Sequence, residues 1–184
     1  MHARLARFSW IVLVVNLAVI AWGALVRATG SGAGCGEHWP LCNGVVVPQD
    51  PAIETMIELT HRVTSGMALL LVLAMTVWAF RAMPRGHLVR RTAALSMFFM
   101  ITESLVGAAL VLLALVGQSQ SPWRAVVMGV HLVNTFLLIG SIALTAHHAG
   151  GAEAPSLARR GAVWTLGIGI ALLLTALGVP RARI

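Results

Sequence analysis

Two histidines stand at similar places in two of the most apolar segments of the chain, where imidazole side chains could bind a metal-bearing group. His61 stands at the start of the apolar run Val63–Phe80, and His131 lies six residues into the run Ala125–Ala146. Imidazoles that project inward from facing helices can supply both axial ligands of one heme iron. Ionisable residues inside apolar spans are costly to bury and are therefore candidates for function. The pair predicts two axial ligands, or one ligand and one substrate contact; the alternative is that each histidine only hydrogen-bonds a neighbouring helix.

Acidic side chains near these histidines could take a proton or hold positive charge. Glu58 precedes His61 by three residues, so on a helix its carboxylate lies one turn above the imidazole, at the rim of a bound macrocycle. The alternative for Glu58 is an ion pair with Arg62, four residues later, worth about 0.2–0.5 kcal/mol. Glu103 falls inside a third apolar segment and needs a partner or a protonated state there. It either tunes the site or makes a structural hydrogen bond.

Cys35 and Cys42 have six residues between them and lie in a polar, glycine-rich segment, residues 28–60, that joins the first two apolar runs. Two cysteines are too few for a disulfide scaffold, but they are close enough together to form one bridge in a loop. An outward-facing loop permits oxidation, so the favoured interpretation is a structural disulfide. The alternatives are a redox-active pair and a metal site that adds His38 to the two cysteines.

The composition indicates which elements must position these residues. Of the 184 residues, 58% are hydrophobic and only 10% are charged. An ordinary soluble domain has about 25% charged residues, so a soluble monomer is excluded. Apolar runs of this length, without strand alternation, predict membrane-spanning helices. The predicted fold is an all-α, polytopic membrane four-helix bundle plus a fifth transmembrane helix, with spans at Phe8–Val26, Val63–Phe80, Ala93–Gly117, Ala125–Ala146 and Gly161–Val179.

Arginines set the expected orientation of these spans. The formal net charge is +7, and arginines cluster in the N-terminal arm and in the connection 81–91. The positive-inside rule predicts a cytoplasmic N-terminus and an outward-facing segment 28–60, although two arginines near the C-terminus then fall on the outer side. Because the charge is a topology signal, no nucleic-acid partner is expected. Asp50 followed by Pro51 predicts the start of the second helix, with Asp50 as its N-cap.

Together these motifs resemble the heme A synthase family. The segment Gly23-Ala-Leu-Val-Arg-Ala-Thr-Gly-Ser-Gly, followed by Cys35-Gly-Glu-His-Trp-Pro-Leu-Cys42-Asn-Gly, is similar to the family's first outer loop. Glu58-Leu-Thr-His61-Arg62 resembles its Glu-x-x-His-Arg motif, and His131 matches its histidine in the fourth helix. Heme A synthases oxidise the C8 methyl of heme O to a formyl group, which supplies heme A to cytochrome oxidase. The resemblance implies heme b or heme O, with its iron, between the two histidines, an essential Glu58, and a redox-sensitive cysteine pair.

The family pattern also predicts domains and partners. Family members have eight helices in two homologous four-helix halves, each with a histidine pair. By this resemblance, residues 1–147 form a first heme-binding half, and residues 148–184 form a linker and a helix like the start of a second half. The resemblance implies heme O as substrate, a heme O synthase, an electron donor, membrane lipid, and a second copy or second-half partner, all at the inner (plasma) membrane.

Two other functions are compatible with the same residues. One is a bis-histidine b-type cytochrome that only transfers electrons, and the other is an inactive heme-binding assembly partner. A simple electron carrier needs neither the cysteine pair nor Glu58, so these residues favour the enzyme.

Overall fold

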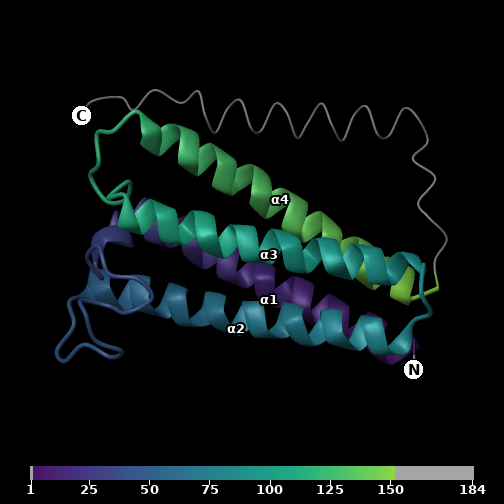
Figure 1. Ribbon diagram of the computed structural model, residues 1–184. Helices are drawn as coiled ribbons and strands as arrows, with labels where there is room; N and C mark the ends of the chain where they lie inside the picture. The colour runs from purple at the N-terminus through teal and green to yellow at the C-terminus, as the bar shows by residue number, and fades with distance from the viewer. Residues whose placement is uncertain (1, 152–184) are drawn as a thin grey trace. The chain divides into compact units, whose positions relative to one another are not determined.

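Four long helices make up most of residues 2–151, the part of the chain that the computed structural model describes (Figure 1). Each helix is long and apolar enough to span a membrane. This confirms the predicted all-helical class, four of the predicted spans and a multi-pass membrane protein. The predicted fifth span, residues 161–179, lies outside the described residues. The helices are α1 (His2–Ala28), α2 (Ile53–Ala82), α3 (Leu88–Leu112) and α4 (Trp123–Ala149), and a short 3-10 helix, η1 (Ser31–Ala33), follows α1.

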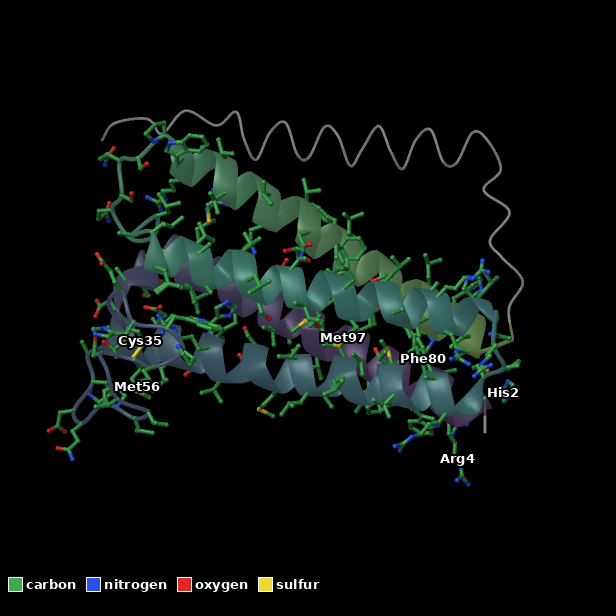
Figure 2. All side chains as sticks on the ribbon, in the orientation of Figure 1. His2, Arg4, Cys35, Met56, Phe80 and Met97 are labelled. Carbon is green, nitrogen blue, oxygen red and sulfur yellow. A yellow bond between two sulfur atoms is a disulfide. The ribbon has the colours of Figure 1, made fainter. Side chains whose placement is uncertain are left out.

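The four helices form a closed ring in which each packs against two neighbours. α1 contacts α2 and α4, and α3 also contacts α2 and α4, so α2 and α4 lie diagonally across the bundle. Successive helices run in opposite directions (Figure 1). The segment 29–52 and the connection 113–122 therefore meet at one end, called the loop end here. Figure 2 shows Cys35 and Met56 at the loop end, and His2 and Arg4 at the opposite end.

Buried apolar side chains fill the bundle away from the loop end. One cluster draws on all four helices, and a second lies closer to the N-terminus of α1. Along α2 and α4, both clusters lie farther from the loop end than His61 and His131 do. Large apolar side chains such as Leu17, Leu70 and Phe136 are exposed on the outside of the bundle, as lipid-facing positions require. The first cluster comprises Val12, Leu13, Ala68, Val72, Met75, Met100, Leu138 and Ile142.

Two predicted helix ends are wrong. α2 begins at Ile53 after Ala52, so Asp50 is not its N-cap; Asp50 instead lies in a turn with a positive φ of 48°. Aspartate tolerates this left-handed conformation better than most residues, and the same tolerance makes it common in turns. α3 ends at Leu112 instead of Gly117, because Ala114 reverses the chain with a φ of 51° inside an uninterrupted apolar sequence. Apolar composition marks a membrane segment but does not mark where its helix stops.

Candidate functional site

The two histidines stand equally far along their helices from the loop end. His61 comes eight residues after Ile53, the first residue of α2, and His131 comes eight residues after Trp123, the first residue of α4. With a rise of about 1.5 Å per residue, each lies about 12 Å along its helix. His131 is near enough to His61 for the two imidazoles to interact electrostatically. The diagonal placement of α2 and α4 therefore sets the two histidines across the bundle from each other.

A glycine of the preceding helix lies against each imidazole. A Cβ atom on Gly23 of α1 would come within 2.9 Å of His61 Cε1 and 3.2 Å of His61 Nε2. A Cβ atom on Gly107 of α3 would lie 3.8 Å from His131 Cε1. Each glycine stands five residues before the end of its helix, so the two helical hairpins repeat the same arrangement. Both glycines precede an alanine, but their equal spacing from the helix ends was not visible in the sequence, because the end of α3 was not predictable from it.

Both imidazoles carry a buried nitrogen that no protein group satisfies. The Nδ1 atoms of His61 and His131 are buried and have no hydrogen-bond partner within residues 2–151. Buried polar atoms are nearly always hydrogen-bonded, and leaving one unpaired costs about 1–3 kcal/mol. The alternative interpretation was that each histidine hydrogen-bonds a neighbouring helix, and neither Nδ1 atom makes such a bond within residues 2–151. Two histidines of this kind, each packed against a glycine and equally far along its helix, are suited to hold a metal-bearing group.

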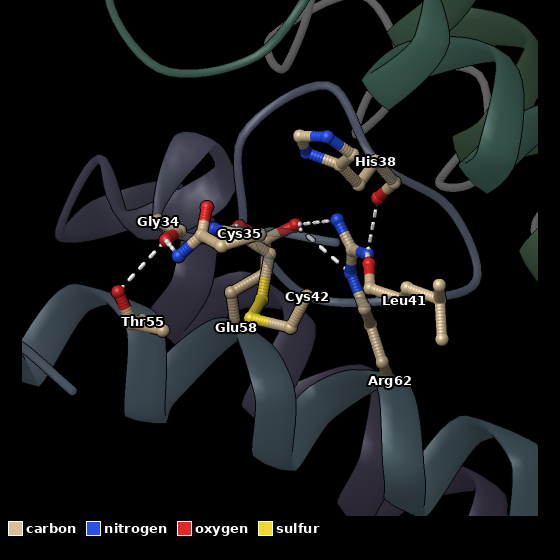
Figure 3. Close-up of polar contacts among 9 residues, drawn as sticks. Gly34, Cys35, His38, Leu41, Cys42, Thr55, Glu58 and Arg62 are labelled. Carbon is tan, nitrogen blue, oxygen red and sulfur yellow. Dashed lines mark hydrogen bonds and ion pairs between the residues drawn. A yellow bond between two sulfur atoms is a disulfide. The ribbon is translucent and has the colours of Figure 1, made fainter. Parts of the chain in front are cut away.

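Glu58 anchors the disulfide loop to α2. Its Oε2 accepts a hydrogen bond from the backbone N–H of Cys35 at 2.7 Å. Its Oε1 accepts one from Arg62 Nε at 3.0 Å and a second, shorter one from Arg62 Nη2. The residue is only 3% exposed, and Figure 3 shows its contacts with Cys35 and Arg62. The predicted ion pair with Arg62 is therefore present, and a further bond to the loop accompanies it.

Arg62 holds the loop from the other side. Its Nη1 donates to the backbone carbonyls of His38 and Leu41, each at 2.6 Å, so one guanidinium joins Glu58 to the segment between the two cysteines (Figure 3). Thr55, two turns before Arg62 on α2, adds a 2.7 Å hydrogen bond to the carbonyl of Gly34. The sequence predicted Arg62 as an ion-pair partner of Glu58 and as part of the Glu-x-x-His-Arg motif, but not as a link to the loop. Its bonds to main-chain carbonyls have no signature in the sequence.

Cys35 and Cys42 form a disulfide with their Cα atoms 4.4 Å apart, and both residues are fully buried. Their sulfurs are thus engaged with each other. Within residues 2–151 no group of three or more His, Cys, Asp or Glu side chains is placed to hold a metal ion. The exposed His38 contributes its backbone carbonyl to Arg62 instead of a side-chain ligand. The geometry favours the disulfide over the cysteine–histidine metal site.

Thiol labelling tests this pairing. We expect protein denatured without reductant to take up no thiol reagent, because both sulfurs are joined, and protein denatured with reductant to take up two labels. Cys35→Ser, which leaves Cys42 without its partner, should take up one label without reductant. Mass spectrometry counts the labels. Two labels on the unreduced wild-type chain would contradict the pairing.

Glu103 lies beside His131. Its Oε2 accepts a hydrogen bond from Asn134 Nδ2 at 2.6 Å, and its Oε1 accepts one from the Thr135 hydroxyl. Nδ1 of His131 lies 3.5 Å from Oε1, within ion-pair distance but without hydrogen-bond geometry. The carboxylate in the third span is half-buried and has its partners on α4, next to one of the two histidines.

Known proteins are similar to this chain over most of its length. A sequence model named COX15-CtaA, described as cytochrome oxidase assembly protein, matches residues 6–179. A Thermus thermophilus protein named protoheme IX farnesyltransferase is 54% identical over 172 residues, which cover 94% of this chain and 28% of that protein. Heme A synthases of an Exiguobacterium species and of Shouchella clausii are 40% and 39% identical; both matches cover 78% of this chain, and they cover 47% and 45% of the relatives. The chain spans less than half the length of these relatives.

Proposed function

The chain belongs to the COX15-CtaA family of cytochrome oxidase assembly proteins, and on that premise we propose that it acts in the formation of heme A. In this proposal residues 2–151 are the heme-binding half of a heme A synthase, which oxidises the C8 methyl of heme O to a formyl group. The heme A synthases that are about 40% identical to the chain support the assignment.

The observation that carries the proposal is the matched pair of histidines. His61 and His131 stand equally far along diagonal helices, each with a glycine against its ring and a buried Nδ1 that has no hydrogen-bond partner within residues 2–151. In the proposal these imidazoles hold the heme iron, since imidazole is a common axial ligand of heme. Gly23 and Gly107 keep the space beside each ring free of side chains. The apolar exterior keeps the site within the membrane, where a farnesylated heme is soluble.

The proposed reaction converts the methyl carbon to a formyl carbon with an oxygen atom from water, and it releases four protons and four electrons, which an electron acceptor must receive. Heme iron supplies the redox chemistry when it is bound. Glu58 is the proposed proton-handling carboxylate, because it lies one turn above His61 on α2. Its bonds to Cys35 and Arg62 fix the position of that carboxylate and couple it to the disulfide loop.

Further parts of the proposal follow from family membership. The loop end faces outward from the inner membrane, because the arginine-rich connection lies at the other end. A second four-helix half, a partner chain or a second copy completes the enzyme. The Thermus relative is named for protoheme farnesylation. The part of it that matches this chain is 28% of its length, and that match lies almost wholly within the family region, residues 6–179 of this chain. We therefore propose the enzyme that farnesylates protoheme as a neighbour in the pathway and do not assign farnesyl transfer to this chain.

Expression in a host that makes heme O but no heme A tests the proposal. The purified full chain should carry heme O or heme b, and heme A should appear among the extracted hemes when the chain is active. Chromatography of the extracted hemes identifies each species. The double variant His61→Ala/His131→Ala is the matched control and should carry no heme. Equal heme content in the wild type and in this variant would refute the site.

The second candidate is a b-type cytochrome that only transfers electrons. One observation favours it, namely that both oxygens of Glu58 are already engaged by Cys35 and Arg62. A carboxylate used purely as a loop anchor would leave the histidine pair with a role in electron transfer alone. In that case the chain would bind heme in the same host and leave heme O unoxidised.

A further inference from the structure

Glu103 is the one carboxylate within residues 2–151 that forms an ion-pair contact with a histidine. It reaches α4 from α3 and meets Asn134 and Thr135, which follow His131 by three and four residues. Those spacings place both residues on the same face of α4 as His131, one turn farther from the loop end. The carboxylate is therefore held directly beneath the imidazole.

The groups that hold Glu103 are themselves fixed. Asn134 Nδ2 also donates to the carbonyl of Phe99 at 2.9 Å, and Asn134 Oδ1 accepts from the Thr102 hydroxyl at 2.6 Å. The Thr135 hydroxyl lies 2.9 Å from the His131 carbonyl as well as next to Glu103 Oε1, and its single proton serves one acceptor at a time. A carboxylate oxygen can accept two hydrogen bonds, so Oε1 can also accept from His131. The network thus fixes the carboxylate and leaves Oε1 able to accept a further hydrogen bond.

The imidazole has one nitrogen suited to that oxygen. His131 Nδ1 is 3.5 Å from Glu103 Oε1, is buried, and has no hydrogen-bond partner within residues 2–151. The contact is attractive when Nδ1 carries the proton and repulsive when Nδ1 presents its lone pair. A carboxylate in this place therefore favours the tautomer whose Nε2 lone pair can bind a metal.

We infer that Glu103 is a positioning residue for His131, which it holds in the Nδ1–H tautomer with Nε2 as the iron-binding nitrogen. The inference rests on the proposed function, because it takes His131 as a heme ligand. Glu103 touches neither substrate nor iron in this scheme and acts only through the imidazole. A hydrogen bond from Nδ1 to a carboxylate makes the imidazole a stronger donor, which stabilises ferric iron relative to ferrous iron.

The two histidines thereby become unequal. His61 also has a buried Nδ1, but the nearby carboxylate on its own helix, Glu58, is engaged by the loop and by Arg62. His61 is confined by Gly23, whereas His131 is held by a charged acceptor. His131 is accordingly the more firmly oriented of the two ligands.

The first test uses the heme-free full chain and does not depend on activity. With histidine labelled in the ring with ¹⁵N, NMR distinguishes the two tautomers, and His131→Ala identifies the signals of His131. We expect the Nδ1–H form in the wild type and a shift toward the Nε2–H form in Glu103→Gln. Thr76→Val is the matched control, because it removes a hydrogen bond between α2 and α3, to the Ala93 carbonyl, outside the network of Glu103 and His131, and it should leave the tautomer unchanged. An Nε2–H form in the wild type would overturn the inference even if Glu103→Gln failed to fold.

The second test uses the heme-loaded chain. We expect a higher midpoint potential in Glu103→Gln than in the wild type, with Thr76→Val unchanged. If the tautomer responds to Glu103 while the potential does not, His131 is not an iron ligand and the proposed function is at fault. If heme binds through His131 but neither the tautomer nor the potential responds, Glu103 is only a link between helices and this inference is wrong.

Discussion

Gly23→Val is expected to weaken heme binding by about one to two orders of magnitude while the four-helix bundle stays folded. The Cβ atom of the new side chain would come within 2.9 Å of His61 Cε1, closer than such atoms approach in folded proteins, so the imidazole must swing away. The end of a side chain moves at small cost to the fold, but a displaced imidazole no longer ligates. Overpacking of this kind costs about 1–3 kcal/mol, which corresponds to a loss in heme affinity of about one to two orders of magnitude.

Three glycines provide graded controls. Gly107→Val should weaken binding less, because a Cβ there lies 3.8 Å from His131 Cε1 and only the outer methyl groups would collide. Gly66→Val and Gly140→Val should have no effect, since nothing lies within 4 Å of a Cβ at either place. Absorbance titration with heme measures affinity, and circular dichroism measures helix content. Wild-type affinity in Gly23→Val would show that His61 is not a ligand in the place where the structure sets it.

The sequence was sufficient to predict the four helices of residues 2–151 and the position of each histidine in the part of its helix nearest the loop end. Long apolar runs have one stable form in a membrane, because only helices satisfy every backbone group within a single segment. Because successive helices alternate in direction, the first turns of α2 and of α4 lie toward the same end of the bundle. His61 and His131 each follow those turns and therefore lie in the half of the bundle nearest that end. Helix ends were not predictable in this way. The apolar sequence continues past Leu112, but the helix ends there and Ala114 adopts a left-handed backbone conformation. The composition of the segment gives no signal for this helix end.

The loop shows a different limit of sequence reasoning. A Glu58–Arg62 pair four residues apart was predictable from helical spacing alone. Its attachment to the loop was not, because the partners of Arg62 are the carbonyls of His38 and Leu41, which every residue type possesses. Contacts between a side chain and the main chain depend on how the loop closes. The sequence therefore predicted a role for Glu58, but it could not show that both carboxylate oxygens accept hydrogen bonds.

Glu58→Gln is expected to eliminate the formyl product. The carboxylate accepts from the Cys35 N–H and from two nitrogens of Arg62, whereas an amide has one oxygen and turns its NH₂ group toward one of these donors. Breaking a buried charge pair typically costs about 3–5 kcal/mol. The loop should loosen and the proposed proton acceptor should be lost together. Chromatography of the extracted hemes should show heme O accumulating in the variant.

Arg62→Gln separates these two consequences. It removes the bonds to Glu58, His38 and Leu41 but leaves the carboxylate of Glu58 beside the Cys35 N–H. Both variants should expose the disulfide, measured as faster reduction by a soluble phosphine in detergent. If Glu58 handles protons, Arg62→Gln keeps part of its product formation while Glu58→Gln keeps none. If both variants lose product equally and their disulfides are reduced at equal rates, Glu58 is a loop anchor only. Full product formation in Glu58→Gln would exclude Glu58 from the reaction, because the carboxylate would then be dispensable both for chemistry and for holding the loop.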